Sequence, residues 1–186
     1  MLHYRTGWYN RKPEIEALPI RVAGVVRESI VDGPDMRYVV FVQGCPHHCK
    51  GCHNPETHPF GTGTDYTAAE IIAMIKKNPM IKGVTLSGGD PFCQAEAFAK
   101  LSAELKKQGY EICAFTGFLF EKLIEDKTDS KYKLLENVDI LIDGPFIESE
   151  KSLELRFKGS RNQRTIDVAK SLAEGRVVLS DSPRWV

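Results

Sequence analysis

Three cysteines within eight residues carry the clearest chemical signal in this sequence. Cys45, Cys49 and Cys52 follow the spacing C-x3-C-x2-C. Three thiolates on one short loop can bind three irons of a cubane iron–sulfur cluster, which leaves the fourth iron without a protein thiolate. A catalytic metal keeps one exchangeable position in the same way. The cysteines therefore predict a 4Fe-4S cluster with one iron open to a ligand.

A structural zinc site is the alternative interpretation of this loop. Its fourth ligand would be His47, His48 or His53. Structural zinc sites usually draw their ligands from two separated pairs, whereas these cysteines are adjacent. The spacing favours the cluster and leaves zinc open. His47 and His48 are otherwise expected to be solvated loop residues or hydrogen-bond donors to the cluster.

The other two cysteines, Cys93 and Cys113, are isolated in the sequence. Cys113 alternates with apolar residues and is expected in the core. Cys93 is expected to pack as well. An odd total of five cysteines, three of them adjacent, indicates metal or cluster binding before it indicates a disulfide framework.

Gly88-Gly89-Asp90-Pro91 is the second group of residues with chemical potential. It follows residues 83–87, a short β-prone run. Glycines that end a strand leave backbone N–H and C=O groups accessible, so a small ligand with amino and carboxylate groups can pair with them. By itself this sequence predicts only a turn. Whether it can bind a ligand depends on its position relative to the cysteines.

The elements that must position these residues alternate between strands and helices. Residues 18–30 are expected to be extended, 38–42 form a strand buried on both faces, and 53–67 form a loop. Thr67 and Glu70 predict a capping box at the start of a helix. Further helices are expected at 94–108, 118–124 and 130–135, further strands at 110–115, 138–142 and 176–179, and a weakly patterned segment at 147–164.

This alternation predicts an α/β domain with a mainly parallel sheet. Ligands in such sheets bind at the carboxyl ends of the strands. The cysteine loop and the turns at Gly88-Gly89, Thr116-Gly117 and Asp143-Gly144 should therefore gather at one edge. Residues 1–17 are polar and unpatterned and are expected to be an N-terminal extension to a single domain, 18–186.

Composition excludes several classes of function. The 25 Lys and Arg balance 25 Asp and Glu, so nothing favours binding to nucleic acid. No apolar run reaches the roughly 20 residues that span a bilayer, and the N-terminus lacks the apolar segment of a secretory signal. We therefore expect a cytoplasmic protein without membrane contact.

The cysteine loop resembles that of the radical S-adenosylmethionine superfamily, whose motif is C-x3-C-x2-C after the first strand of a barrel. Gly88-Gly89-Asp90 is similar to the superfamily's Gly-Gly-Glu motif in an Asp-containing form. The resemblance implies a partial (β/α) barrel, open on one side, that holds a 4Fe-4S cluster and the cosubstrate S-adenosylmethionine. Cys45, Cys49 and Cys52 would then hold the cluster.

The resemblance also implies the cosubstrate contacts. Gly88, Gly89 and Asp90 would hold the methionine end of S-adenosylmethionine, and the backbone of residues 51–53, Gly51, Cys52 and His53, would flank the adenosyl group. Asp143 is either a further contact or a turn-forming residue before Gly-Pro.

Within the superfamily the chain resembles the activases of glycyl radical enzymes, through residues 29–34, Arg37, 41–45 and 54–57. Asp35 departs from that pattern, because relatives commonly have Gly there. Four further segments are similar to the activases of anaerobic ribonucleoside-triphosphate reductase: residues 50–52, 116–118, 143–146 and 158–164.

This narrower resemblance implies two partners: the large subunit of that reductase, and a flavodoxin- or ferredoxin-type electron donor. Lys158, Arg161 and Arg164 would form part of a docking face or a solvated loop. The alternatives are an activase of another glycyl radical enzyme such as pyruvate formate-lyase, a radical enzyme acting on a small molecule, and a zinc-stabilised binding module.

Overall fold

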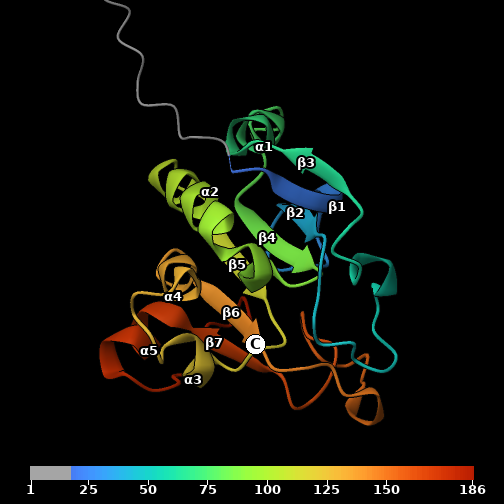
Figure 1. Cartoon of the computed structure of the whole chain (residues 1–186). Coiled ribbons are helices and arrows are strands. Elements are labelled where there is room, and N and C mark those ends of the chain that lie inside the picture. Colours follow the sequence, from blue (N-terminus) through green and yellow to red (C-terminus); the bar gives the residue numbers. More distant parts are fainter. Residues whose placement is uncertain (1–17) are drawn as a thin grey trace, which may run out of the picture.

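The computed structural model describes residues 18–186; the predicted extension, residues 1–17, lies outside them. In the described part, seven strands form one sheet in the order β3-β1-β2-β4-β5-β6-β7 (Figure 1). The strands are β1 (Ile20–Ser29), β2 (Arg37–Val42), β3 (Thr64–Tyr66), β4 (Gly83–Gly88), β5 (Glu111–Phe115), β6 (Ile140–Asp143) and β7 (Arg164–Asp167).

The four central strands, β2, β4, β5 and β6, pair in parallel. The outer strands β1, β3 and β7 pair antiparallel with their neighbours. The predicted α/β class is therefore confirmed, and the mainly parallel arrangement holds for the central strands. Because these four strands share one direction, their carboxyl ends and the loops that follow lie at one edge of the sheet.

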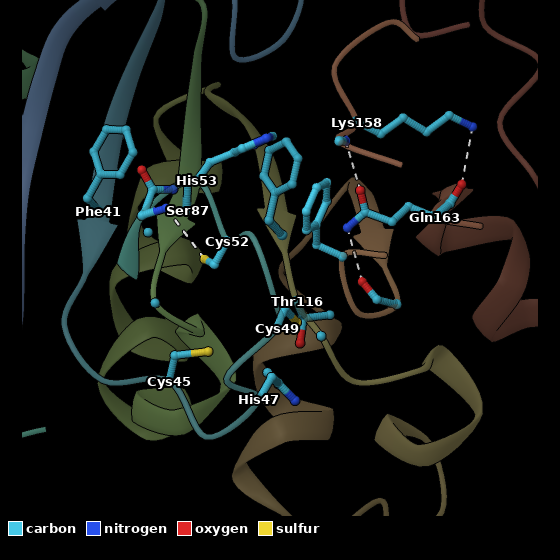
Figure 2. Close-up of a pocket in the computed structure, with 18 of the residues that line it drawn as sticks. Phe41, Cys45, His47, Cys49, Cys52, His53, Ser87, Thr116, Lys158 and Gln163 are labelled. Atoms are coloured by element: carbon cyan, nitrogen blue, oxygen red, sulfur yellow. Dashed lines mark hydrogen bonds between the residues drawn. The ribbon is translucent and has the colours of Figure 1, made fainter. Parts of the chain in front are cut away.

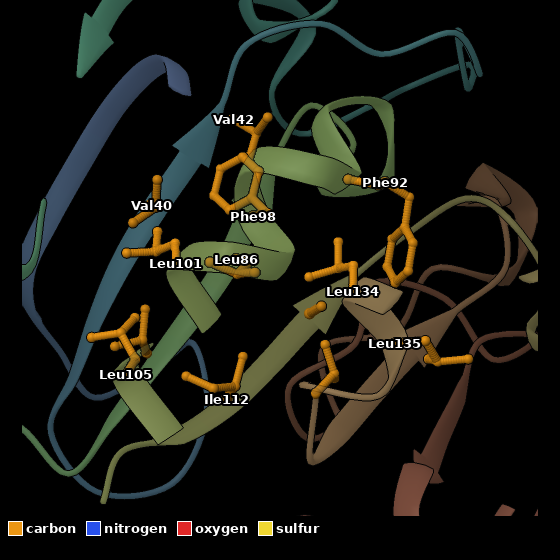
Figure 3. Close-up of a cluster of buried hydrophobic side chains, with 14 of the residues drawn as sticks. Val40, Val42, Leu86, Phe92, Phe98, Leu101, Leu105, Ile112, Leu134 and Leu135 are labelled. Carbon is orange, nitrogen blue, oxygen red and sulfur yellow. The ribbon is translucent and has the colours of Figure 1, made fainter. Parts of the chain in front are cut away.

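Helices cover one face of this sheet. They are α1 (Ala68–Ile75), α2 (Ala95–Lys107), α3 (Phe120–Leu123), α4 (Ser130–Leu135) and α5 (Val168–Glu174). Alternate strand residues such as Val40, Leu86 and Ile112 pack against Phe98 and Leu101 of α2, all buried (Figure 3). The capping box predicted at the start of α1 is confirmed. Among residues 18–186, no helix has the length and apolarity to cross a membrane.

The predictions for the last part of the chain were partly wrong. Residues 176–179 do not form a strand; Leu179 makes only an isolated bridge to Ile166. The last strand is instead β7, which pairs with β6 through Ile166 and Leu141, and α5 follows it directly. β7 begins at the last residue of the segment judged weakly patterned, and α5 lies in residues 165–175, for which no element was expected. A four-residue edge strand has too few residues to display alternation. The three-residue strand β3 was likewise expected to be loop.

The opposite face of the sheet, here called the cavity face, has a small apolar cluster of its own. Cys113, Ile140 and Ile142 pack there with Trp185, whose side chain is 2% exposed. The Trp185 ring also contacts Phe157, at 5.5 Å between centroids. The C-terminal residues therefore close the part of the cavity face that lies away from the strand ends.

Arg37 is fully buried beneath Trp185, with its guanidinium 5.2 Å from the ring centroid. It donates hydrogen bonds to Thr85 Oγ1 (2.7 Å) and Glu111 Oε2 (2.8 Å). A buried charge is tolerated only when it is paired and hydrogen-bonded, and these contacts meet that requirement.

Replacing Trp185 by Ala should destabilise the protein by about 3 kcal/mol, because the change leaves a cavity and uncovers Arg37. Thermal unfolding followed by circular dichroism should show a melting temperature lower by roughly 6–12 °C. Leu153→Ala is the control, since Leu153 is 95% exposed and should leave the melting temperature unchanged. Equal melting temperatures for all three proteins would contradict a sealing role for Trp185.

Candidate functional site

A cavity of about 460 Å³ opens at the carboxyl ends of the central strands (Figure 2). The expectation that the loops gather at this edge is confirmed, since Cys45, Gly89, Thr116 and Gly144 all line the cavity. Each of these residues follows a different strand. The cavity floor is formed by strand side chains that point to the cavity face, Phe41, Ser87 and Phe115.

All three predicted cluster cysteines line this cavity as free thiols. Cys45 is buried, whereas Cys49 and Cys52 are partly accessible. Burial is the largest of the effects that raise the pKa of the Cys45 thiol, and the nearby Asp90, Cys49 and Cys52 act in the same direction. Three thiolates at this spacing therefore repel one another, and cationic irons would offset that repulsion.

The number of thiols that line the cavity matches the three cysteine ligands of the predicted cluster. Such a cluster takes one thiolate at each of three irons, so its sulfur ligands surround the metal centre and do not converge on one ion. Among residues 18–186, no three His, Cys, Asp or Glu side chains converge in the manner of a single-ion site. The Asn54 N–H donates to Cys52 Sγ at 3.4 Å.

Backbone hydrogen bonds fix the start of the cysteine loop. Gly44 N–H donates to Thr57 O (2.7 Å), and Cys45 N–H donates to His58 O (3.1 Å). Gly44 has a φ of +101°, and a Cβ there would overlap the Phe60 ring. Gly51, at φ +72°, completes the loop against Glu148. Glycine is therefore required at both ends of the loop.

The Gly88-Gly89 turn lies directly against the start of the cysteine loop. Gly89 N–H donates to Val42 O (2.7 Å), and Asp90 N–H donates to Gly44 O (2.9 Å). A Cβ on Gly89 would overlap the Gly44 carbonyl oxygen, and one on Gly88 would lie 2.7 Å from Phe41 Cα. Both glycines line the same cavity as the three cysteines.

The Asp90 carboxylate is fully buried and bonds to the neighbouring loops. Its Oδ2 accepts hydrogen bonds from Thr116 Oγ1 (2.8 Å) and Gly117 N–H (3.1 Å), and its Oδ1 accepts one from Phe92 N–H (2.9 Å). His47 Nε2 lies 2.7 Å from the same Oδ2. His47, expected to be solvated or to face the cluster, is therefore held by Asp90.

Of the residues expected beside the adenosyl group, Cys52 and His53 line the cavity, whereas Gly51 is not among its lining residues. His53 lines the cavity and packs on Phe146, with ring centroids 4.8 Å apart. Gly51 packs against Glu148 at the loop's outer side. Phe146 belongs to the segment 143–146 that carried the family resemblance, but nothing in the sequence indicated that its ring would reach the cavity.

Asp143 behaves as a structural residue. Its buried carboxylate accepts from Phe120 N–H (2.8 Å) and from Arg164 Nε (2.9 Å). Arg164 also pairs with Glu121 at 2.8 Å. These ion pairs occupy the Arg164 guanidinium and raise its pKa further above the usual arginine range. Arg164 thus links the start of β7 to the end of β6 through Asp143 and to α3 through Glu121.

Lys158 and Gln163 line the far wall of the cavity. Gln163 Oε1 accepts from Gly159 N–H (2.8 Å), its Nε2 donates to Gly144 O (3.0 Å), and Lys158 Nζ donates to Gln163 O (3.2 Å) (Figure 2). Gln163 therefore joins the loop after β6 to the loop before β7, a role the sequence did not reveal.

Of the remaining two cysteines, Cys113 is buried in the core as expected, whereas Cys93 is only partly buried. Cys113 is completely buried on the cavity face, and burial raises the pKa of its thiol to about 12. Cys93 lies just beyond Asp90, and burial likewise raises its pKa to about 12. Neither lines the cavity, so both differ from the three loop cysteines.

Several known proteins have similar sequences. The family model described as a 4Fe-4S single cluster domain matches residues 31–166. The anaerobic ribonucleoside-triphosphate reductase-activating protein of Vibrio cholerae is 37% identical over 143 residues, covering 73% of this chain and 90% of that protein. The Escherichia coli K12 protein of the same name is 31% identical over 143 residues, with the same coverage.

Activating enzymes of a second kind are also similar. The pyruvate formate-lyase-activating enzyme of Listeria monocytogenes is 34% identical over 175 residues, covering 89% of this chain and 66% of that enzyme. Among solved structures, QueE from Escherichia coli matches with a TM-score of 0.45 and 15% identity, over 53% of this chain and 52% of that one.

The sequence matches define first a class, the 4Fe-4S single cluster proteins, and then a group within it. The chain belongs to the radical S-adenosylmethionine family of activating proteins, together with the anaerobic ribonucleoside-triphosphate reductase-activating proteins.

Gly89→Ala should weaken binding of a ligand at the Gly88-Gly89 edge of the cavity, because the added Cβ overlaps the Gly44 carbonyl and forces the ends of β2 and β4 apart. We expect at least a tenfold loss of activity, measured as cleavage of S-adenosylmethionine by the reconstituted protein. Gly61→Ala is the matched control, because a Cβ at Gly61 meets no atom within 4 Å. Wild-type activity in Gly89→Ala would show that the close approach is dispensable.

Proposed function

We propose that this protein uses a 4Fe-4S cluster on Cys45, Cys49 and Cys52 to cleave S-adenosylmethionine and to generate the glycyl radical of anaerobic ribonucleoside-triphosphate reductase. The observation that carries the proposal is the juxtaposition of three free thiols with the Gly88-Gly89 backbone in one cavity. The relatives that match 90% of their own length are activating proteins of that reductase.

The cofactor supplies the difficult chemistry. Bound by Cys45, Cys49 and Cys52, a reduced 4Fe-4S cluster would supply the electron that splits S-adenosylmethionine into methionine and a radical able to take a hydrogen atom from the Cα of a glycine in the reductase.

The contribution of this chain is to bind, orient and enclose. Cys45, Cys49 and Cys52 hold three irons, and the backbone of Gly88 and Gly89 holds the amino and carboxylate groups of the methionine end. The His53 ring and the backbone of Gly51 and Cys52 flank the adenosyl group. Apolar side chains of the cavity, Phe41, Phe115, Phe146 and Phe157, exclude water from the reacting atoms.

We further propose that the sheet forms a partial barrel, open on one side, so that a protein loop can bring its glycine to the cavity. The antiparallel outer strands β1 and β7 and the closing contact of Trp185 support this shape. The electron comes from a flavodoxin- or ferredoxin-type protein. The proposal places the protein in the reducing cytoplasm, where the three thiols stay unoxidised.

The direct test is to mix anaerobically reconstituted protein with dithionite, S-adenosylmethionine and the reductase large subunit. Electron paramagnetic resonance should show the doublet of a glycyl radical. A doublet on pyruvate formate-lyase and none on the reductase would favour the second candidate, which the Listeria relative supports. Colourless protein with zinc and no sulfide would end both proposals.

Cys49→Ala should lose the cluster and all cleavage activity, because two thiolates cannot replace three on this loop. Cys113→Ala should keep both, since Cys113 is buried away from the cavity. Iron and sulfide content and methionine release measure the two effects. Full iron content in Cys49→Ala would remove Cys49 from the ligand set.

A further inference from the structure

His47 lies between two cluster cysteines, yet its ring is turned toward Asp90. Its Nε2 is 2.7 Å from Asp90 Oδ2, and the ring is only 17% exposed. Because a carboxylate accepts hydrogen bonds and cannot donate them, Nε2 is the donor in this pair. The contact crosses 43 residues of sequence and joins the cysteine loop to the turn after β4.

Two further contacts hold the His47 ring in place. The ring meets Phe118 edge-on, with centroids 4.6 Å apart. It also packs so closely on Gly117 that any Cβ there would overlap it. Gly117 N–H and Thr116 Oγ1 donate to the same Asp90 oxygen that His47 contacts. The loops after β2, β4 and β5 therefore meet at one carboxylate oxygen.

This arrangement buries the Asp90 carboxylate completely, so neither of its oxygens is exposed to a ligand in the cavity. Oδ2 has three partners, Oδ1 accepts from Phe92 N–H, and the residue is 0% exposed. A contact between the Asp90 carboxylate and S-adenosylmethionine would require breaking buried, charge-assisted hydrogen bonds. The contacts of the Asp90 side chain in this structure are all with the loops that it joins.

We infer that the His47–Asp90 pair is a positioning device that sets where the cysteine loop stands relative to the Gly88-Gly89 edge. The inference rests on the proposed function, because it concerns how the open iron and the methionine-binding backbone are brought to one cosubstrate. The three thiols hold the cluster by themselves. The His47–Asp90 pair fixes the cluster at the distance from Gly88 and Gly89 that simultaneous binding needs.

Cluster binding by the thiols and positioning by the His47–Asp90 pair can therefore be separated. Without the His47 contact the cluster still forms, because every thiolate is present. The amino and carboxylate groups of S-adenosylmethionine then no longer reach the iron and the glycine edge together, so binding weakens. Removal of a residue that orients a metal ligand typically costs 10–100-fold in affinity or activity.

The test compares His47→Leu with wild type in two measurements on anaerobically reconstituted protein. Equilibrium dialysis with labelled S-adenosylmethionine against the oxidised, cluster-loaded protein should give a Kd raised at least about tenfold. The electron paramagnetic resonance spectrum of the reduced cluster should change on addition of S-adenosylmethionine in wild type and much less in the variant. Iron and sulfide content should be equal.

Two further variants separate positioning from general damage. His47→Gln retains an N–H donor that reaches Asp90 and should restore most of the affinity. His48→Asn is the matched control: it changes the adjacent residue between the same two cysteines, and Asn tolerates the positive φ of +47° found there. It should bind S-adenosylmethionine as wild type does.

The outcomes distinguish this inference from the proposed function. Equal Kd values for wild type and His47→Leu would overturn the positioning role alone. Loss of iron from His47→Leu would also overturn it, because His47 would then be needed to hold the cluster. A wild-type chain that carries the cluster and binds no S-adenosylmethionine would overturn the proposed function and this inference with it.

Discussion

Two backbone hydrogen bonds beyond the end of the sheet tie the cysteine loop to the glycine turn. They run from Gly89 N–H to Val42 O and from Asp90 N–H to Gly44 O. The parallel pairing of β2 and β4 brings these segments together, and the absence of a Cβ at Gly89 lets them touch. Every feature of the site depends on this contact, because it places a thiolate-bearing loop and an exposed backbone edge on one cavity.

The rest of the molecule maintains that contact from two sides. Around the strand ends, the buried Asp90 carboxylate collects donors from the loops after β2, β4 and β5. At the other end of the cavity face, the side chain of Arg37 is buried against the sheet, and the Trp185 ring covers it. The cavity is thus a gap between two well-packed regions. Its walls present thiols, backbone groups and aromatic rings, which suits a cofactor that performs the chemistry itself.

Much of this could be predicted from the sequence, because the signals were local. The spacing of the cysteines, the Thr67–Glu70 cap and the apolar runs of the central strands each lie within a few residues. Parallel strands then bring their carboxyl ends to one edge, so the meeting of the loops also followed. The position Asp35, where relatives commonly have Gly, adopts a φ of +59°, so the turn keeps a glycine-like conformation with Asp in place.

The features that were missed depend on contacts between distant residues. β7 is recognisable only through its pairing with β6. The position of the His47 ring depends on contacts with Asp90, Gly117 and Phe118, which belong to two other loops. Asp143 carries the same signature as Asp90, an acidic residue at a strand end, but its partner is Arg164. No local pattern separates these cases, because a buried carboxylate is defined by the donors that surround it.

In the proposed site, three thiolates leave one iron of the cluster open to S-adenosylmethionine. Mössbauer spectroscopy of the reconstituted, iron-57-labelled protein tests it directly. Addition of S-adenosylmethionine should change the signal of a single iron site and leave the others as they were, since only one iron lacks a cysteine ligand. A spectrum that S-adenosylmethionine leaves unchanged would contradict this account.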